Sequence, residues 1–277
     1  MGAADRRTRI GNEALPSTSV PPRDLAAAVV LIPARLASTR LPDKPLADIA
    51  GVPMIVHVWR RAVEAALGPV VVACAEPAIA AAITAVGGEA VLVPDDVPSG
   101  TDRIWRALAR LDPEGRYHTV VNVQGDLPTL DPAALRRVVE PLDRLGTDIA
   151  TLVSPTDDEA ERNATSVVKA VVSFPADEPT LGRALYFTRA PAPWGEGPVW
   201  HHIGIYAFRR AAIDRFCTLP ASPLERRRRR SGSPSRASPA PTATWPAGRP
   251  FPSSSHCPAI RSRTPSQRCA RGRPGWP

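Results

Sequence analysis

Residues 29–46 read VVLIPARLASTRLPDKPL, and this stretch decides the fold. Its apolar start predicts a strand buried on both faces, and Pro33 ends the apolar run. The loop that follows, stiffened by two more prolines, carries three cations and two hydroxyls: Arg35, Arg40, Lys44, Ser38 and Thr39. A loop after the first strand of an α/β sheet lies where such folds bind ligands, and several cations on a stiff loop suit a polyphosphate. We therefore expect a phosphate-binding loop, with a solvated basic loop as the alternative.

Strands and helices alternate after this loop. Helices are expected at 53–67, 77–86, 100–111 and 131–145, and strands at 70–74, 89–93 and 119–123. Parallel strands joined by right-handed helical crossovers form a doubly wound sheet. The first half of the chain is therefore predicted to be α/β, with a mostly parallel, doubly wound sheet.

The pattern changes from Asp148 onward. Strand-like runs are expected at 149–153, 167–174, 185–187 and 203–208. Such a mixed region forms either an antiparallel extension of the sheet or a small lobe that closes over the site. The residues alone leave both arrangements open.

Asp126 is the strongest candidate for a catalytic acid. It follows the expected strand 119–123 in the run Val-Gln-Gly-Asp, where the glycine permits a tight turn at the ligand edge of the sheet. One carboxylate combined with substrate phosphates suits Mg²⁺, which prefers oxygen ligands and keeps several waters. Asp126 is therefore a candidate metal ligand, and the alternative is a carboxylate that caps a turn or the following helix.

A second candidate segment is Ser99-Gly100-Thr101, which precedes an expected helix with Asp102 and Arg103 in its first turn. Amides and a hydroxyl at a helix start can hydrogen-bond a phosphate or a base edge. An ordinary helix N-cap explains the same residues equally well.

Six ordered motifs resemble those of the 3-deoxy-manno-octulosonate cytidylyltransferase (CMP-Kdo synthetase) family. They are IPARLASTRLPDKPLADIAGVPMIVHV from Ile32, SGTDR from Ser99, VNVQGD from Val121, ALYFTRA from Ala184, and HIGIY from His202 followed by SPLE ending at Glu225. The resemblance spans about residues 27–225. Ordered motifs at suitable spacings are more specific than any one of them.

The resemblance implies a fold like that of nucleotide-diphospho-sugar transferases, in which a small β lobe closes over the site and contributes to a homodimer. It implies transfer of CMP from CTP to 3-deoxy-manno-octulosonate (Kdo), with Mg²⁺ as cofactor and a role in lipopolysaccharide biosynthesis. The nucleotide-binding positions it implies are Pro33, Ala34, Arg35, Ser38, Arg40, Lys44, Ser99, Gly100 and Arg103. The catalytic group would be Arg35, Arg40, Lys44 and Asp126, with Asp126 as the metal ligand.

The sugar acid would be bound by Gln124, Arg189, His202, Tyr206 and Glu225. A carboxylated sugar needs a cation for its acid group and hydrogen-bonding side chains for its hydroxyls. For Arg189 the alternative is a surface salt bridge. Because adjacent side chains on a strand face opposite ways, His201 and His202 favour one histidine in the pocket and one outside it over a zinc site. A cytidylyltransferase for another sugar acid, such as a sialic acid, is the closest alternative function.

Three segments depart from the family pattern. Leu127 follows Asp126 where the family often has a second acid, and Cys74-Ala75 stands where Thr-Asp is common. Residues 93–97, VPDDV, also lack the family's more polar pattern, which usually has Thr-Arg and a histidine. The departures at 74–75 and 93–97 predict weaker nucleotide recognition, and Leu127 weakens the argument for a second acidic group after Asp126.

The charge of the chain is divided unevenly. The total is +8, but residues 226–277 hold twelve arginines and no acid, so residues 1–225 carry −4.

Four scattered cysteines without a CxxC pair favour neither a zinc site nor a disulfide framework. With neither a membrane-spanning apolar stretch nor a secretory leader, we expect a cytoplasmic protein, with residues 1–25 as a disordered leader. The expected domain is 26–225, divided into a nucleotide-binding half (26–147) and an incomplete sugar-binding and dimerisation half (148–225).

Residues 226–277 differ sharply from the rest. They are rich in arginine, serine and proline, and such a segment cannot bury enough surface to offset its ordering entropy, so disorder is expected. The abrupt loss of family motifs suggests a shifted reading frame, a hypothesis that fails if neither alternate frame of the coding DNA restores them. On that hypothesis the chain is a catalytically impaired, nucleotide-binding remnant. The run of five arginines predicts at most non-specific, salt-sensitive contact with nucleic acid.

Overall fold

The computed structural model describes residues 27–36, 43–93, 97–144, 146–220 and the backbone of 259–262. The expected leader and most of the arginine-rich segment lie outside these ranges. The helices are α1 (Met54–Glu64), α2 (Pro77–Thr84), α3 (Gly100–Leu111), α4 (Pro132–Val139), α5 (Glu159–Asn163) and α6 (Arg210–Thr218), with 3-10 turns η2 (Lys44–Leu46) and η3 (Glu140–Asp143). None of the helices in the described ranges is long and apolar enough to cross a bilayer.

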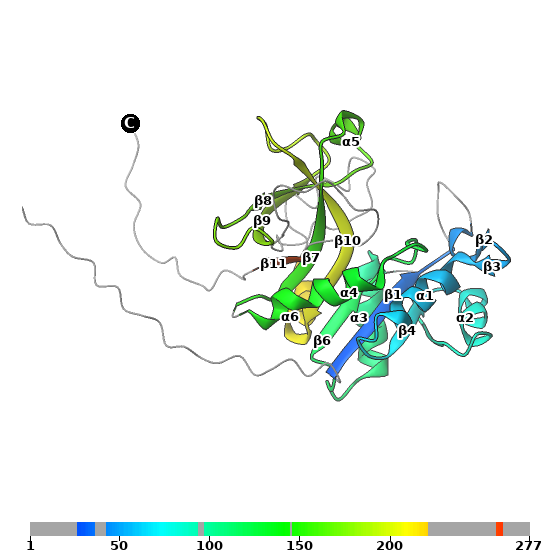
Figure 1. Cartoon of the computed structure of the whole chain (residues 1–277). Coiled ribbons are helices and arrows are strands. Elements are labelled where there is room, and N and C mark those ends of the chain that lie inside the picture. The colour runs from blue at the N-terminus through cyan, green and yellow to red at the C-terminus, as the bar shows by residue number, and fades with distance from the viewer. Residues whose placement is uncertain (1–26, 37–42, 94–96, 145, 221–258, 263–277) are drawn as a thin grey trace, which may run out of the picture.

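A nine-stranded sheet among the described residues forms the centre of the molecule (Figure 1). Its strands are β1 (Ala28–Ala34), β4 (Val70–Cys74), β5 (Glu89–Leu92), β6 (Thr119–Asn122), β7 (Ile149–Thr156), β8 (Lys169–Ser173), β9 (Leu181–Thr188), β10 (Val199–Arg209) and β11 (Ala259–Ser262). Their order is β5-β4-β1-β6-β10-β7-β11-β9-β8. Two short strands, β2 (Asp48–Ile49) and β3 (Val52–Pro53), form a separate hairpin after the cationic loop.

The two halves of the chain contribute different parts of this sheet. Strands β5, β4, β1 and β6 are parallel, as predicted. Strand β10 then pairs antiparallel with both β6 and β7, so the second half forms the antiparallel extension. The far end of that extension, with β8 and β9, has its own small apolar cluster around Val153, Ala170 and Ala184. The structure therefore combines an antiparallel extension with a small β lobe at its end.

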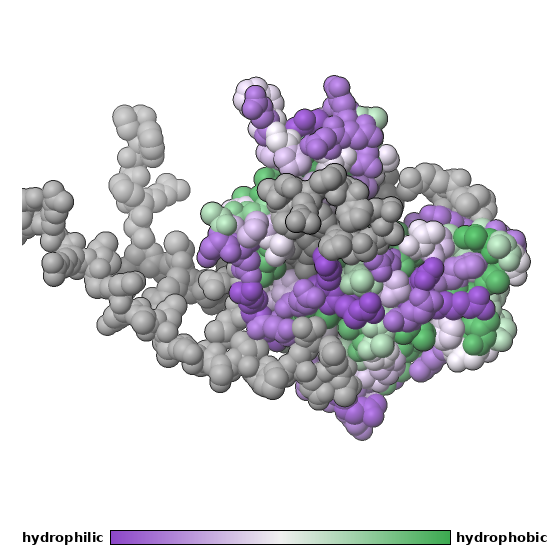
Figure 2. Space-filling model, in the orientation of Figure 1, coloured by the Kyte–Doolittle hydropathy of each residue, from purple (hydrophilic) through white to green (hydrophobic). Residues whose placement is uncertain are grey.

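Apolar clusters cover both faces of the parallel part. One face packs against α1, α2 and α4 through residues such as Val56, Ile79 and Leu135. The other packs against α3 and α6 through Ile104, Leu108 and Ile213. On the face drawn in Figure 2, hydrophilic side chains form a band over α1 and α4, as expected for helices that bury one side. The chain is thus doubly wound.

Some elements differ from the sequence prediction. The helix expected at 131–145 begins as predicted, with Asp131 as N-cap, but becomes the 3-10 turn η3 after Val139 because Pro141 has no N–H to continue an α-helix. Helices α5 and α6 were not predicted. Strand β11 lies within the segment expected to be disordered, and it runs between β7 and β9. Each of these two strands has one edge whose backbone N–H and C=O groups pair with β11. Backbone pairing on both sides can therefore hold four residues as a strand without an apolar sequence pattern.

Candidate active site

Three segments converge at Pro33, near the end of β1. An ideal Cβ built on Gly125 would lie 2.8 Å from the Pro33 carbonyl oxygen, and one built on Gly100 would lie 3.1 Å from Pro33 Cγ. The start of α3 and the turn after β6 therefore both pack directly against the end of β1. Glycine at position 125 is required because any larger residue would collide with backbone, which cannot rotate away.

The cationic loop and the acidic turn meet in an ion pair. Lys44 Nζ lies 2.7 Å from Asp126 Oδ2, although the two residues are 82 positions apart in the sequence. Both side chains remain accessible, with exposed fractions of 36% for Lys44 and 51% for Asp126. An exposed pair contributes little net free energy, so both groups can exchange their partner for a ligand.

The loop after β1 is anchored at its first residues. The Leu36 amide donates to the Glu76 carboxylate over 3.0 Å, and the Ala75 amide donates to the Ala34 carbonyl over 3.2 Å. The side chain of Arg35, between these anchors, is exposed. The predicted ligands Ser38 and Arg40 lie outside the described residues.

The start of α3 uses the predicted residues for local structure. Ser99 is the N-cap: its hydroxyl accepts from the Asp102 amide at 3.2 Å and donates to the Asp102 carboxylate at 2.6 Å. Arg103 is buried and donates to the Val93 carbonyl over 2.8 Å. The capping alternative therefore accounts for Ser99 in this structure, and the ligand role of this segment stays a prediction.

A row of side chains crosses the sheet on its α3 side. The strand registers pair Leu31 with Asn122, Asn122 with Tyr206, and Tyr206 with Thr151. Asn122 is fully buried, and among the described residues neither its side-chain oxygen nor its side-chain nitrogen has a hydrogen-bond partner. An unpartnered buried amide is costly, so its presence beside Tyr206 suggests a ligand contact.

His202 lies at the end of this row. Its Nε2 is 3.0 Å from Thr151 Oγ1, and its ring contacts Phe187 and Tyr206 with centroid distances of 4.7 and 5.4 Å. Burial, with a smaller contribution from the neighbouring His201, lowers the pKa of His202 to about 3, so the ring is neutral at physiological pH.

The neighbouring histidine points elsewhere. His201 Nδ1 lies 3.6 Å from the Glu161 carboxylate and is partly exposed. The prediction that the two histidines face opposite ways is confirmed.

Gln124 lies close to the same part of β10. A Cβ on Gly204 would be 3.3 Å from Gln124 Cγ. Gln124, His202 and Tyr206, all predicted to bind the sugar acid, thus share one region, whereas Glu225 lies outside the described residues.

Arg189 is held by backbone carbonyls. Its Nη1 donates to the carbonyls of Thr165 and Ser166 over 2.6 and 3.1 Å, which differs from the salt bridge considered as its alternative role. The buried Lys169 donates to the carbonyls of Arg189 and Val167, both at 3.1 Å. Burial, then the charge of Arg189, lowers the pKa of Lys169. Together these two cations tie the end of β9 to the loop before β8.

Asn122, Thr151 and Lys169 were missed in the sequence. A polar or charged residue within each apolar strand run was the available signal. Their contacts depend on register between strands, which the sequence pattern does not give.

The donor set suits a metal shared with substrate. Across the described ranges, no three side chains of His, Cys, Asp or Glu gather in a cluster able to hold a metal ion. The accessible carboxylate of Asp126 fits Mg²⁺ that takes its other ligands from phosphates and water.

Comparison with known proteins gives a consistent result. The sequence profile of the cytidylyltransferase family matches residues 29–230. A 3-deoxy-manno-octulosonate cytidylyltransferase of Parvibaculum lavamentivorans is 61% identical over 197 residues, covering 71% of this chain and 76% of the relative. Its counterpart in Rhodospirillum centenum is 62% identical over 199 residues, covering 72% and 77%. A solved CMP:2-keto-3-deoxy-manno-octonic acid synthetase in complex with CTP aligns at 35% identity with a TM-score of 0.65, covering 74% of this chain and 86% of the other.

Proposed function

The chain belongs to the cytidylyltransferase family, and from that premise we propose that it transfers CMP from CTP to the anomeric hydroxyl of Kdo. The anomeric oxygen forms a bond to the α-phosphorus, the bond from that phosphorus to the β-phosphate oxygen breaks, and pyrophosphate leaves with both electrons. The hydroxyl proton passes to solvent or to a phosphate oxygen.

The contact between Lys44 and Asp126 is the observation that best supports this proposal. At the edge where the parallel strands end, this contact joins a residue expected to bind the triphosphate, Lys44, to the residue expected to bind the metal, Asp126. When CTP enters, Lys44 would turn to a phosphoryl oxygen and Asp126 would bind Mg²⁺. Arg35, Ser38 and Arg40 would hold the rest of the triphosphate.

Mg²⁺ at Asp126 would supply charge neutralisation on the phosphoryl oxygens. The protein's own work is positioning: the cations fix the triphosphate, and the row on β6 and β10 fixes the sugar acid so that attack is in line. Three of the predicted residues, Gln124, His202 and Tyr206, would hydrogen-bond sugar hydroxyls together with the buried amide of Asn122. Arg189 would face the carboxylate with the guanidinium donors that the loop carbonyls leave free. Glu225 would complete the pocket.

The cellular setting follows from the same family. We propose that the enzyme is cytoplasmic, acts as a homodimer and supplies CMP-Kdo to lipopolysaccharide synthesis. Leu185, Tyr186 and Trp194, which expose large apolar side chains on the β lobe, support a self-association surface. Sedimentation of the purified chain at several concentrations tests the dimer.

Pyrophosphate release by the full chain, with CTP, Mg²⁺ and a panel of sugar acids, tests the reaction. We expect release that needs both CTP and Kdo and that falls sharply with UTP or ATP. Release with N-acetylneuraminate but not with Kdo would favour the sialic-acid alternative. Asp126→Asn is the matched control, since it keeps the shape of the side chain and removes its charge.

A further inference from the structure

Thr151 occupies an unusual position on β7. It is fully buried, and its hydroxyl oxygen lies near three polar atoms of β10. The distances are 2.6 Å to the carbonyl oxygen of Ile205, 3.1 Å to that of Ile203 and 3.0 Å to Nε2 of His202. This contact sits where the register between β7 and β10 shifts, between Ile203 and Tyr206. The irregularity brings two carbonyls of one strand to a single hydroxyl of its neighbour.

The hydrogen atoms of this cluster can be assigned by counting. A threonine hydroxyl has one hydrogen and accepts through its lone pairs. At 2.6 Å the carbonyl oxygen of Ile205 must receive that hydrogen, because two oxygens that close without a hydrogen between them would repel. The hydroxyl therefore has no hydrogen left for His202, so Nε2 of His202 must be the donor. A neutral histidine protonated at Nε2 carries an unprotonated Nδ1.

The ring of His202 is also held in place. Phe187 lies edge-on at 4.7 Å and Tyr206 lies at 5.4 Å between centroids. Within the part of the chain that the structure describes, Nδ1 has no hydrogen-bond partner. His202 thus offers a lone pair from a ring of fixed tautomer and restricted orientation.

We propose that Thr151 is a positioning residue that locks His202 in the Nε2-protonated tautomer, so that Nδ1 accepts a hydrogen bond from a hydroxyl of the sugar acid. The inference rests on the proposed function, in which His202 contacts the sugar. It gives His202 the role of a neutral acceptor that selects a hydroxyl donor. The sugar carboxylate must then be bound by a different side chain.

Nitrogen NMR of the full chain labelled at its histidine rings tests the lock without turnover. Wild-type His202, assigned with His202→Gln, is expected to show a protonated Nε2 and an unprotonated Nδ1 before any ligand is added. Thr151→Val removes the hydroxyl at nearly constant shape and should lose this single tautomer, whereas Thr151→Ser should keep it. A wild-type ring protonated at Nδ1, or an unchanged tautomer in Thr151→Val, overturns the proposal whatever the chain binds.

A Kdo titration tests the consequence for binding. Added Kdo should shift the Nδ1 resonance of the wild type, and Thr151→Val should raise the half-saturating Kdo concentration about tenfold, the loss expected for one hydrogen bond. Half-saturation by CTP, measured on the same samples, should change less than about twofold because one hydrogen bond on the sugar side does not reach the nucleotide. Equal losses for CTP and Kdo would indicate general misfolding and overturn the proposal.

A second pair of variants keeps the test independent of Thr151→Val folding. His202→Asn can place an amide oxygen where Nδ1 stands, whereas His202→Gln reaches the Nε2 position. We expect His202→Asn to retain more Kdo affinity than His202→Gln, and the reverse order overturns the proposal. If the wild-type chain binds no Kdo, the proposed function fails, and the tautomer measured without ligand still decides the lock.

Discussion

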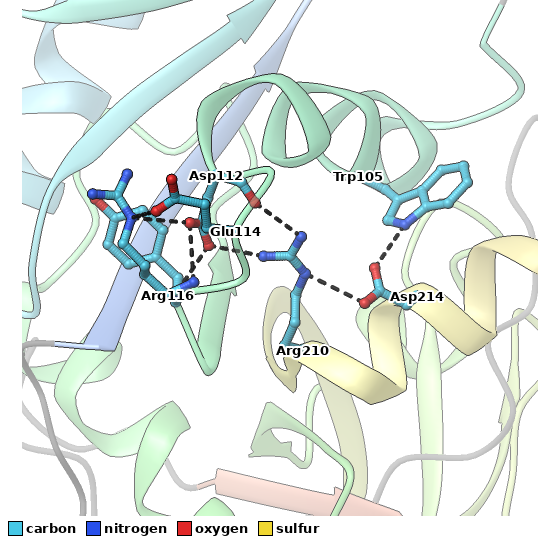
Figure 3. A network of polar contacts seen from close by, with 7 residues as sticks. Trp105, Asp112, Glu114, Arg116, Arg210 and Asp214 are labelled. Atoms are coloured by element: carbon cyan, nitrogen blue, oxygen red, sulfur yellow. Dashed lines mark hydrogen bonds and ion pairs between the residues drawn. The ribbon is translucent and has the colours of Figure 1, made fainter.

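Two carboxylates near opposite ends of β6 are held in contrasting ways. Before the strand, Asp112 is fully buried and accepts hydrogen bonds from the amides of Arg116 and Tyr117, at 3.0 and 2.9 Å, and from Arg210 Nη1 at 3.0 Å. Figure 3 shows how Arg210 extends this cluster to Asp214, which accepts from Trp105 Nε1 at 2.9 Å. After the strand, Asp126 is half exposed and paired with Lys44.

The difference separates a structural acid from an exchangeable one. Burial raises the pKa of Asp112, but the hydrogen bonds from Tyr117 and Arg116 outweigh burial and hold that pKa below its ordinary value. Its oxygens are committed, so it joins α3, β6 and α6 and has no capacity for a ligand. Asp126 is half exposed to solvent, so binding a metal or releasing Lys44 costs little desolvation.

The largest expected effect comes from breaking the buried cluster. Asp112→Asn removes the buried charge that pairs with Arg210, leaves Asp214 as the remaining acid partner of Arg210, and places an amide donor against N–H groups. We expect a loss of about 3–5 kcal/mol in the free energy of unfolding. Urea unfolding measures it. Glu114→Gln is the matched control, because Glu114 is 76% exposed and its Oε2 lies 3.7 Å from Arg116 Nε, too far for a hydrogen bond. This substitution should lower the free energy of unfolding by less than about 0.5 kcal/mol. Equal losses in the two variants would remove the distinction.

Asp126→Asn should show the opposite profile. We expect kcat for pyrophosphate release to fall about 10²–10³-fold, as for the loss of one electrostatic group in a transition state, while stability changes by less than about 1 kcal/mol. Steady-state kinetics and urea unfolding on one preparation measure both quantities. A stability loss as large as that of Asp112→Asn, with kcat preserved, would contradict the assignment.

Asn122→Leu sharpens the comparison on β6 itself. An unpartnered buried amide costs about 1–3 kcal/mol, so its replacement by an apolar side chain should maintain or raise stability. Kdo affinity should fall at the same time if the amide binds the sugar. A variant that is less stable and binds Kdo normally would make Asn122 structural. Val120→Leu, on the same strand face, controls for added volume.

The smallest expected effect is a pH dependence from His202. Its folded pKa, about 3, lies below the ordinary value of 6.5, so the unfolded chain takes up a proton that the native ring excludes. Its contribution to stability is therefore present above about pH 6.5 and is lost as pH falls toward 3, by roughly 1–2 kcal/mol at pH 5. The difference between the urea midpoints of unfolding at pH 7 and at pH 5 should be smaller in His202→Phe than in the wild type. An equally steep loss in the variant would assign the effect to other groups.

The parallel half of the fold follows directly from local patterns. Apolar runs at β1, β4 and β6 alternate with helical periodicity, and carboxyl ends of parallel strands meet at one edge. That rule brought Lys44 and Asp126 into one predicted site. The cap at Asp131 was equally readable, since its carboxylate accepts from the Ala133 amide.

The antiparallel half was less predictable because its contacts are set by tertiary register. Helix α6 buries Ala212, Ile213 and Phe216, too few apolar positions to give a clear period. The irregularity in β10 interrupts the simple alternation from which its full length could be recognised. The contact between Thr151 and His202 joins residues 51 apart through that irregularity, and local sequence carries no signal for it.

The main-chain contact at Pro33 has a consequence for how the reactive groups are spaced. Gly125 meets the Pro33 carbonyl without an intervening side chain, so the gap between the two loops is inherited from the roughly 4.8 Å spacing of neighbouring strands. Rotamer changes elsewhere in the pocket leave that gap unaltered. Backbone geometry therefore sets the width of the edge at which we propose that the nucleotide binds. Under that proposal, changes of side chain around this edge would alter the preference for the acceptor sugar, while the distance between the phosphate-binding loop and Asp126 stays constant.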